Sequence, residues 1–407
     1  MVVKRRWGGL VVASWLAEGN VLAASHVQED DRMTIPVLLL LIAQGSLAQG
    51  CDTARIRQVI AELQARQQNV GVQVAVRAGG RLVYSRGFGF ADVEDSARVT
   101  PRTILGIASV TKAVTGLALL ELWERGRLDL DAPVQRYVPT FPVKPGLPIT
   151  PRLLAAHLAG LRHWGSERGP VLYARHFDDV KDVLPLFQDD TLVAAVGSGY
   201  HYSSPGYNLL GAAIEAAAGM SYQQWVTESV LRPLGLGATG FDDVRAVLPL
   251  RARRYSFYDL TTFAELTQPV RVPEWDYSHN MAGGNLNSTA GDLVRLGAAV
   301  LAPGFLSDSA YRLLTTPVPS ASGPSPMAFG WFISGLAGPP RRITISGSNA
   351  GVQAGIAVFP DQGVVVAAIT NTWGKGSRSG EFVSAAPDGL LGRMAVACGE
   401  RRERGSR

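Results

Sequence analysis

The chain of 407 residues has few of the side chains that bind metals. It contains only two cysteines, Cys51 and Cys398, which lie at opposite ends. Its six histidines show neither the H-x-H nor the H-E-x-x-H spacing that places imidazoles around one ion. We therefore expect no metal site and no cofactor. The sequence also lacks any G-x-S-x-G segment, which argues against an α/β-hydrolase fold.

Long apolar runs and basic blocks are also missing from most of the chain. After residue 50 no apolar run is long enough to cross a bilayer, so we expect no membrane span in the mature chain. The net charge is +5, but the basic residues are scattered and not interleaved with aromatics, which argues against nucleic acid as a partner. Hydrophobic residues make up 46% and charged residues 18%, which predicts a globular protein with a sizeable core.

Residues 1–48 are expected to form a leader. An apolar run covers 37–43, and the small residues Ser46 and Ala48 fit signal-peptidase cleavage after Ala48. Met33 opens this segment directly, so translation could start there. A competing interpretation combines the basic residues 4–6 with the apolar stretch 10–16. Both interpretations predict a periplasmic or secreted protein.

Cys51 directly follows this leader, and its chemistry has two interpretations. Gly50-Cys51 is compatible with a lipoprotein site, although the residues before it match the usual leucine-led box poorly. In an exported protein Cys51 could instead form a disulfide with Cys398. Two unrelated thiols remain the simple alternative.

Periodic patterns predict the elements at both ends of the chain. Apolar spacing predicts a helix from about 52 to 66, and the alternating valines of 70–76 predict a strand that turns at Gly79-Gly80. A polar, glycine-rich loop is expected over 87–101. The sequence further predicts helices at 109–124, 151–159, 206–219, 290–302 and 385–398, and strands at 343–346, 355–359 and 364–369, the last two joined by a turn at 360–363.

This order predicts an α+β fold. An antiparallel sheet is built from both chain ends and flanked by helices, with a large, mostly helical insertion. We expect a sheet domain from 49–130 plus 325–400, a helical domain from 131–324 and a solvated tail at 401–407. Both terminal helices can pack on the one sheet, which favours the Cys51–Cys398 disulfide.

The chain has only five lysines, and only Lys112 has a serine three positions before it. Residues i and i+3 share one face of a helix. Ser109-Val110-Thr111-Lys112 therefore places a hydroxyl beside an amine, which is a nucleophile next to its candidate base.

Several segments around this pair resemble one superfamily, the serine β-lactamases and penicillin-binding proteins (peptidase S12-type), over about 55–398. Segment 103–112 resembles the nucleophile segment. Leu153–Leu161 is similar to LLTHTSGL, and Tyr202–Gly211 to YSNxGYxLLG. The stretch 282–292 and Ser346–Gly351 resemble the later motifs. Segments 161–164 and 251–280 look most like the mitochondrial serine β-lactamase-like protein and its bacterial relatives.

This resemblance implies a β-lactamase-like fold and a role for each matching residue. Ser109 would attack a carbonyl and become acylated, while Lys112 and Tyr202 would share the work of the base. The backbone N–H groups of Ser109 and Ser348 would form the oxyanion hole. The resemblance further implies substrate-binding positions at Ser204, Gly347 and Asn349.

Two residues depart from the family pattern. The family's substrate-contacting asparagine is replaced by Ser204, and its basic residue of the third motif is replaced by Ile345. The basic residue binds a substrate carboxylate, so we expect poor recognition of β-lactams and D-Ala-D-Ala peptides. The nucleophile and both proposed bases are retained.

The sequence thus predicts an exported serine hydrolase that acts on small-molecule or peptide substrates with ester, amide or peptide bonds. One alternative is a non-catalytic binding or scaffolding protein on the same fold. A second is a β-lactamase or D,D-peptidase. No pattern in the sequence sets the oligomeric state.

Overall fold

An eight-stranded antiparallel sheet organises the protein. The structure is a computed structural model that describes residues 51–165, 169–335, 341–375 and 380–399, so the expected leader and the tail 401–407 lie outside the described residues. The strands follow the order β3-β2-β1-β13-β12-β11-β10-β9, which places the two chain ends side by side at β1 and β13. The bounds are β1 Gly71–Ala78, β2 Arg81–Asp92, β3 Ala97–Arg98, β9 Met327–Ala328, β10 Trp331–Ser334, β11 Arg342–Asn349, β12 Val352–Phe359 and β13 Val364–Thr370.

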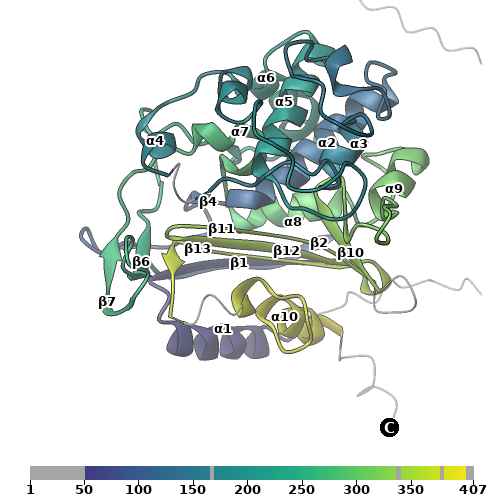
Figure 1. Ribbon diagram of the computed structural model, residues 1–407. Helices are drawn as coiled ribbons and strands as arrows, with labels where there is room; N and C mark the ends of the chain where they lie inside the picture. Colours follow the sequence, from purple (N-terminus) through teal and green to yellow (C-terminus); the bar gives the residue numbers. More distant parts are fainter. Residues whose placement is uncertain (1–50, 166–168, 336–340, 376–379, 400–407) are drawn as a thin grey trace, which may run out of the picture. The chain divides into compact units, whose positions relative to one another are not determined.

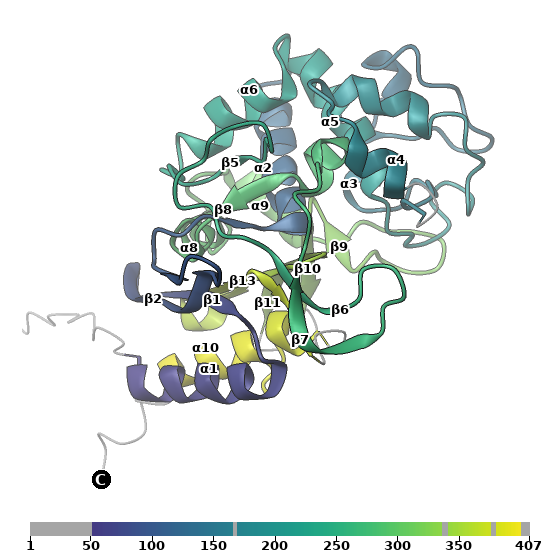
Figure 2. The same ribbon diagram turned by 90° about the vertical axis from the view of Figure 1, so that its left-hand side faces the viewer.

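Two helices from opposite ends of the chain cover one face of this sheet. Helices α1 (Thr53–Gln67) and α10 (Leu390–Gly399) lie side by side beneath it (Figures 1 and 2). Alternate valines of β1, such as Val74 and Val76, point toward α1 and α10, while Ala75 between them joins the core on the other face. The predicted α+β arrangement is confirmed.

A disulfide joins Cys51, just before α1, to Cys398 in α10, and the two cysteines are 347 residues apart in sequence. The Asp52 N–H also donates to the Ala397 carbonyl at 2.9 Å, so the backbones meet at the same place. The two chain ends are therefore fastened beneath the sheet.

Removing this disulfide is expected to lower the free energy of unfolding by about 2–4 kcal/mol, because the cross-link restricts a long loop of the unfolded chain. The measurement is the urea midpoint of the oxidised protein against a variant with both Cys51→Ser and Cys398→Ser. The reduced wild-type protein is the control and should unfold with the variant. Equal midpoints for the oxidised protein and the variant would contradict the expectation.

The opposite face of the sheet carries most of the helices (Figure 1). Helix α8 (Ala290–Ala298) lies directly on it, and a Cβ on Gly297 would come within 2.5 Å of the Val365 side chain. Helix α2 (Thr111–Glu124) is almost wholly buried among its neighbours. The other helices on this side are α3 Pro151–Ala155, α4 Gly169–Ala174, α5 Ser204–Ala218, α6 Tyr222–Val226, α7 Met281–Gly284 and α9 Asp308–Thr315.

Two small sheets complete the architecture. The strands β6 (Tyr255–Tyr258) and β7 (Glu265–Arg271) form a hairpin that pairs with β14 (Thr372–Trp373), and Figure 1 shows it on the same side as α4. The second small sheet comprises β4 Leu105–Gly106, β8 Leu286–Ser288 and β5 Gly240–Phe241. The region 131–324 thus contains strands as well as the expected helices.

The predicted loop over 87–101 is partly wrong, since β2 continues to Asp92 and pairs with β3. Gly87 and Gly89 allow this because a Cβ on either would lie within 2.3 Å of a neighbouring carbonyl oxygen. These glycines permit close strand contact instead of marking a turn. The last helix also starts later than predicted, at Leu390, because the Gly389 N–H closes a turn onto the Ala386 carbonyl.

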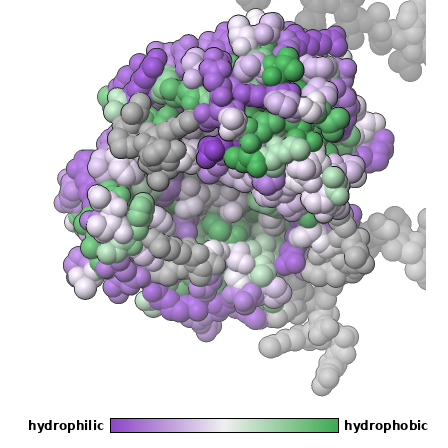
Figure 3. Space-filling view, viewed as in Figure 1, coloured by the Kyte–Doolittle hydropathy of each residue, from purple (hydrophilic) through white to green (hydrophobic). Residues whose placement is uncertain are grey.

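No helix among the described residues is both long and apolar enough to span a membrane. The face drawn in Figure 3 shows hydrophobic residues interspersed with hydrophilic ones. Exposed large hydrophobic side chains such as Val143 and Val247 are well separated in sequence, as is usual for a globular surface.

Candidate active site

Ser109 lies in a one-turn 3₁₀ helix, Ala108–Val110, that leads directly into α2. Ala108 has a φ of 45°, a left-handed conformation that few non-glycine residues adopt. The Thr111 hydroxyl donates to the Ala108 carbonyl at 2.7 Å and holds this turn. Ser109 therefore sits at the amino end of a 14-residue helix, where the helix dipole favours negative charge.

Lys112 is the second residue of α2 and is fully buried. Its Nζ donates to the Gly283 carbonyl at 2.6 Å, to Ser204 Oγ at 3.0 Å and to Ser109 Oγ at 3.3 Å. These three acceptors match the three N–H donors of an ammonium group. Gly283 suits this contact because a Cβ there would lie 3.3 Å from Nζ. The amine is thus held in one position beside the Ser109 hydroxyl.

Tyr202 approaches Ser109 from the other side. Its hydroxyl donates to Ser109 Oγ at 2.8 Å, and Lys112 Nζ lies 4.8 Å from its ring centroid. Tyr202 directly precedes α5, whose start is fixed by the N-cap Ser203, which accepts from the Gly206 N–H at 3.0 Å. The structure therefore brings together all three predicted catalytic residues.

Two histidines hold Tyr202 in place. His157 Nδ1 accepts from the Ser203 N–H at 3.0 Å, and His163 Nδ1 accepts from the Ser204 N–H at 3.2 Å. Their ring centroids lie 4.3 Å and 5.3 Å from that of Tyr202. Burial lowers the pKa of His157 well below its usual value and that of His163 to about 4. At neutral pH both imidazoles are therefore uncharged supports for the tyrosine.

The pKa values of Lys112 and Tyr202 both shift toward easier proton loss. Burial lowers the pKa of Lys112, since the charged ammonium is removed from water. Burial alone would raise the pKa of Tyr202, but the charge of Lys112 and the hydrogen bonds with Lys112 and Ser109 lower it overall. Such a pair can accept the proton of Ser109 at a lower pH than a solvated lysine or tyrosine could.

Strand β11 runs close past the nucleophile. A Cβ on Gly347 would come within 2.6 Å of the Ser109 backbone nitrogen and 2.9 Å of that of Val110. Only glycine permits this approach. The backbone of the next residue, Ser348, is thereby carried to the side of Ser109.

The remaining predicted site residues lie in different surroundings. Ser348 and Asn349 line the cleft above Ser109, and Ser204 lines it while its hydroxyl accepts from Lys112. Gly347 contacts the nucleophile turn instead of lining the cleft. Ile345 is 1% exposed and packs in the core, so the strand position where the family has a basic residue supplies no charge to the cleft.

The cleft has a volume of about 1130 Å³, enough for a substrate with both an acyl part and a leaving group. Its floor is formed by Ser109 and neighbours from α7 and β11. Its walls come from four separate segments, at 163–165, α4, the turn between β6 and β7, and 275–280, together with β14. The aromatic side chains on these walls were not predicted as site residues, because the segments share no periodic pattern.

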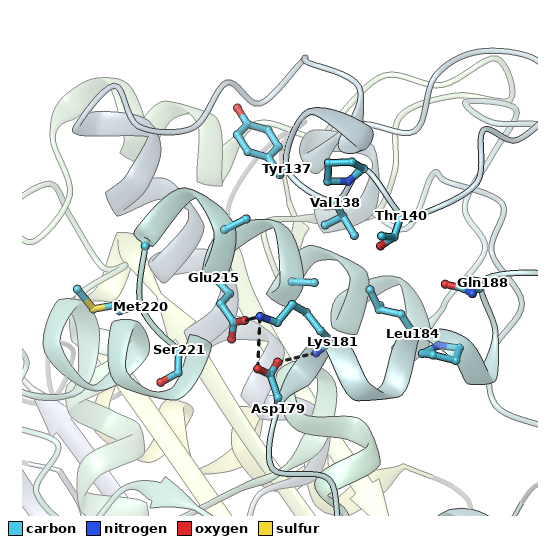
Figure 4. Close-up of a pocket in the computed structure, with 15 residues that line it drawn as sticks. Tyr137, Val138, Thr140, Asp179, Lys181, Leu184, Gln188, Glu215, Met220 and Ser221 are labelled. Atoms are coloured by element: carbon cyan, nitrogen blue, oxygen red, sulfur yellow. Dashed lines mark hydrogen bonds and ion pairs between the residues drawn. The ribbon is translucent and has the colours of Figure 1, made fainter.

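A second cavity, of about 800 Å³, lies at the carboxyl end of α5 (Figure 4). Lys181 pairs there with Glu215 at 2.5 Å and with Asp179 at 3.5 Å, and Figure 4 shows the three side chains pointing toward one another. The Lys181 ammonium is thus paired with two carboxylates. No serine among the described lining residues lies beside a buried amine. No group of three or more potential metal ligands occurs within the described residues. The Ser109 cleft is therefore the candidate active site.

This geometry agrees with comparisons to known proteins. The model of the family described as beta-lactamase matches residues 56–386. The chain belongs to the β-lactamase family. The predicted superfamily is thus confirmed.

Individual relatives in this β-lactamase family share the similarity. The chain is 29% identical over 331 residues to the human serine beta-lactamase-like protein LACTB, mitochondrial, with 61% of this chain and 59% of the relative covered. It is 26% identical over 312 residues to penicillin-binding protein 4* of Bacillus subtilis, with 72% and 66% covered. The chain therefore spans about three fifths of the human relative.

A solved structure confirms that the fold is β-lactamase-like. The octameric penicillin-binding protein homologue from Pyrococcus abyssi superposes with a TM-score of 0.68 at 25% identity. The match covers 85% of this chain and 77% of that chain. The two proteins therefore share the same overall fold.

Proposed function

We propose that the chain is an exported serine hydrolase that cleaves ester, amide or peptide bonds through an acyl-enzyme on Ser109. The observation that carries this proposal is the fully buried Lys112 amine within hydrogen-bonding distance of the Ser109 hydroxyl. Burying an ammonium is unfavourable unless the group loses its proton or is paired. A purely structural site has no need of this arrangement, whereas a general base does.

The contacts give a proton path for acylation. As Ser109 Oγ forms a bond to the substrate carbonyl carbon, its proton passes to the Lys112 and Tyr202 pair. The carbonyl oxygen becomes an oxyanion beside the backbone N–H groups of Ser109 and Ser348. Collapse of this intermediate breaks the bond to the leaving alcohol or amine, which takes a proton from Tyr202.

Deacylation uses the same groups in the reverse direction. A water molecule gives its proton to the pair as its oxygen attacks the acyl carbon. The Ser109 oxygen leaves and regains a proton, and the acid product departs. The cycle needs no group beyond the three side chains, the two N–H donors and water.

Ester hydrolysis tests the proposal. Purified protein should hydrolyse 4-nitrophenyl butyrate, and a fluorophosphonate probe should block the activity with one-to-one stoichiometry. Folded protein that neither turns over the ester nor takes up the probe would favour a scaffolding role on the same fold.

The pH profile of kcat/KM should rise to a plateau below pH 10. The pair accepts the Ser109 proton only after losing its own, and the pKa values of Lys112 and Tyr202 are both lowered from their usual 10.5 and 10.0. Activity is therefore lost as pH falls through the lowered pKa and is retained above it. His163, with a pKa of about 4, should not contribute above pH 6. A profile that rises only above pH 10 would contradict this assignment.

The Cys51–Cys398 disulfide supports the exported location, because disulfides persist in oxidising compartments. The proposed cleavage site after Ala48 lies outside the described residues. The mass of the mature protein from the native host tests this point, since cleavage would leave Gln49 as the first residue. A mature protein that retains residues 1–48 would overturn it.

A further inference from the structure

The cleft above Ser109 is lined by uncharged side chains. Among the described residues that line it there is no Lys, Arg, Asp or Glu. Its two histidines, His163 and His279, each have a pKa lowered to about 4 by burial, so both are neutral near pH 7. Arg254, a buried cation, does not line the cleft and donates to Asp242 at 2.5 Å. A bound carboxylate would find no described charged side chain lining the cleft to pair with.

The walls of the cleft are strongly aromatic. Trp275 stacks on Tyr173, with ring centroids 4.8 Å apart and planes within 7°. On the other wall Phe263 meets Trp373 edge to face at 6.1 Å. All four residues line the cleft that contains Ser109. Such surfaces favour a planar ring or a bulky apolar group over a small polar one.

The rim of the aromatic wall is fixed by an aspartate cap. Asp259 Oδ1 accepts from the Thr261 N–H at 2.9 Å and the Thr262 N–H at 2.7 Å, and the Phe263 N–H donates to the Asp259 carbonyl at 3.0 Å. Phe263 has a φ of 58° and is 48% exposed, an uncommon conformation for a bulky residue. The turn thus holds an exposed aromatic ring at the mouth of the cleft before any ligand arrives.

Neutral hydrogen-bonding groups complete the lining. Asn280, Ser348 and Asn349 face the same cleft. The Oδ1 atoms of Asn280 and Asn349 are buried and make no hydrogen bond within the described residues. These amides can bond a neutral polar group of a substrate without supplying charge.

We propose that this cleft selects uncharged esters or amides whose acyl group carries an aromatic ring or a comparably large apolar group, and discriminates against substrates with a carboxylate. The inference rests on the proposed hydrolase function and names the substrate class of the same site. Transfer of a carboxylate from water into a lining without a cation is strongly unfavourable.

Two matched substrates test the inference. The 4-nitrophenyl esters of 4-methylphenylacetic acid and 4-carboxyphenylacetic acid share the leaving group and the ring and differ in one substituent. The methyl-substituted ester should have a kcat/KM about tenfold higher, or more, than the carboxylate-substituted ester. 4-Nitrophenyl butyrate serves as the small aliphatic reference.

Two variants assign the selectivity to the cleft. Trp275→Ala should lower the ratio of kcat/KM for the methyl-substituted ester to that for the butyrate ester about fivefold. Thr261→Lys, at the exposed rim of the cleft, should raise kcat/KM for the carboxylate ester about fivefold. Tyr137→Ala, in the separate cavity of Figure 4, is the aromatic control and should change none of these values.

The possible outcomes distinguish a failure of the proposed substrate class from a failure of the proposed hydrolase function. Equal or faster turnover of the carboxylate ester, with activity still dependent on Ser109, overturns the substrate class and leaves the hydrolase intact. An unchanged preference in both Trp275→Ala and Thr261→Lys also overturns it. Absence of turnover of all three esters, together with no labelling of Ser109, overturns the proposed function and the inference with it.

Discussion

Replacing Ser109 by alanine is expected to lower kcat for 4-nitrophenyl butyrate by about 10⁴-fold or more, because the acyl-enzyme can no longer form. Ser109 Oγ accepts hydrogen bonds from both Tyr202 and Lys112, so its removal leaves these two proposed bases without a nucleophile. The measurement is steady-state hydrolysis corrected for the spontaneous rate. The thermal midpoint should stay within a few degrees of the wild-type value.

The control for this prediction is Ser309→Ala, which removes an exposed hydroxyl on α9. It should keep wild-type activity. Turnover within about tenfold of wild type in the Ser109 variant would mean that another group carries the chemistry.

Replacing Lys112 by methionine is expected to lower the acylation rate by about 10²- to 10⁴-fold, the usual range for loss of a general base. Methionine has a similar length and no charge, so it can occupy the buried position beside Gly283. The fold should survive, because the variant no longer buries an amine. The measurement is the burst phase of 4-nitrophenol release, which separates acylation from deacylation.

A matched control is Lys144→Met, since the Lys144 amine donates to the backbone carbonyls of Gln188 and Asp190 and does not line the cleft. Its burst should equal that of the wild type. Tyr202→Phe should show a reduced burst and reach its pH plateau at a lower pH, because Tyr202 raises the pKa of Lys112 and that effect is lost with the hydroxyl. A normal burst in Lys112→Met would remove lysine from the mechanism.

Much of the fold was predictable because its elements carry periodic patterns. The alternating valines of β1 share one face, which packs against α1 and α10, so their spacing predicts a strand with a buried face. Ser109 and Lys112 were also predictable as neighbours, since a three-residue spacing fixes their distance along one short helical segment. The contact of Tyr202 with Ser109 depended on resemblance, because 93 residues separate them.

The substrate side of the cleft was not predictable in the same way. Phe263, Trp275 and Trp373 come from separate segments that meet only after the hairpin β6–β7 pairs with β14. No local sequence pattern predicts the contact between these segments. The glycines at 87 and 89 were wrongly predicted to lie in a loop for a related reason. Glycine is typical of both turns and close strand contacts, and only the neighbouring strand decides between the two.

The most direct test of the account is the mass of the protein during turnover. The purified chain is mixed with 4-nitrophenyl 4-methylphenylacetate, quenched in acid within the burst phase and mapped by peptide mass spectrometry. The account predicts one added 4-methylphenylacetyl group, on the peptide and residue of Ser109, and none in Ser109→Ala. An adduct on another residue, or rapid turnover without any adduct at Ser109, would contradict it.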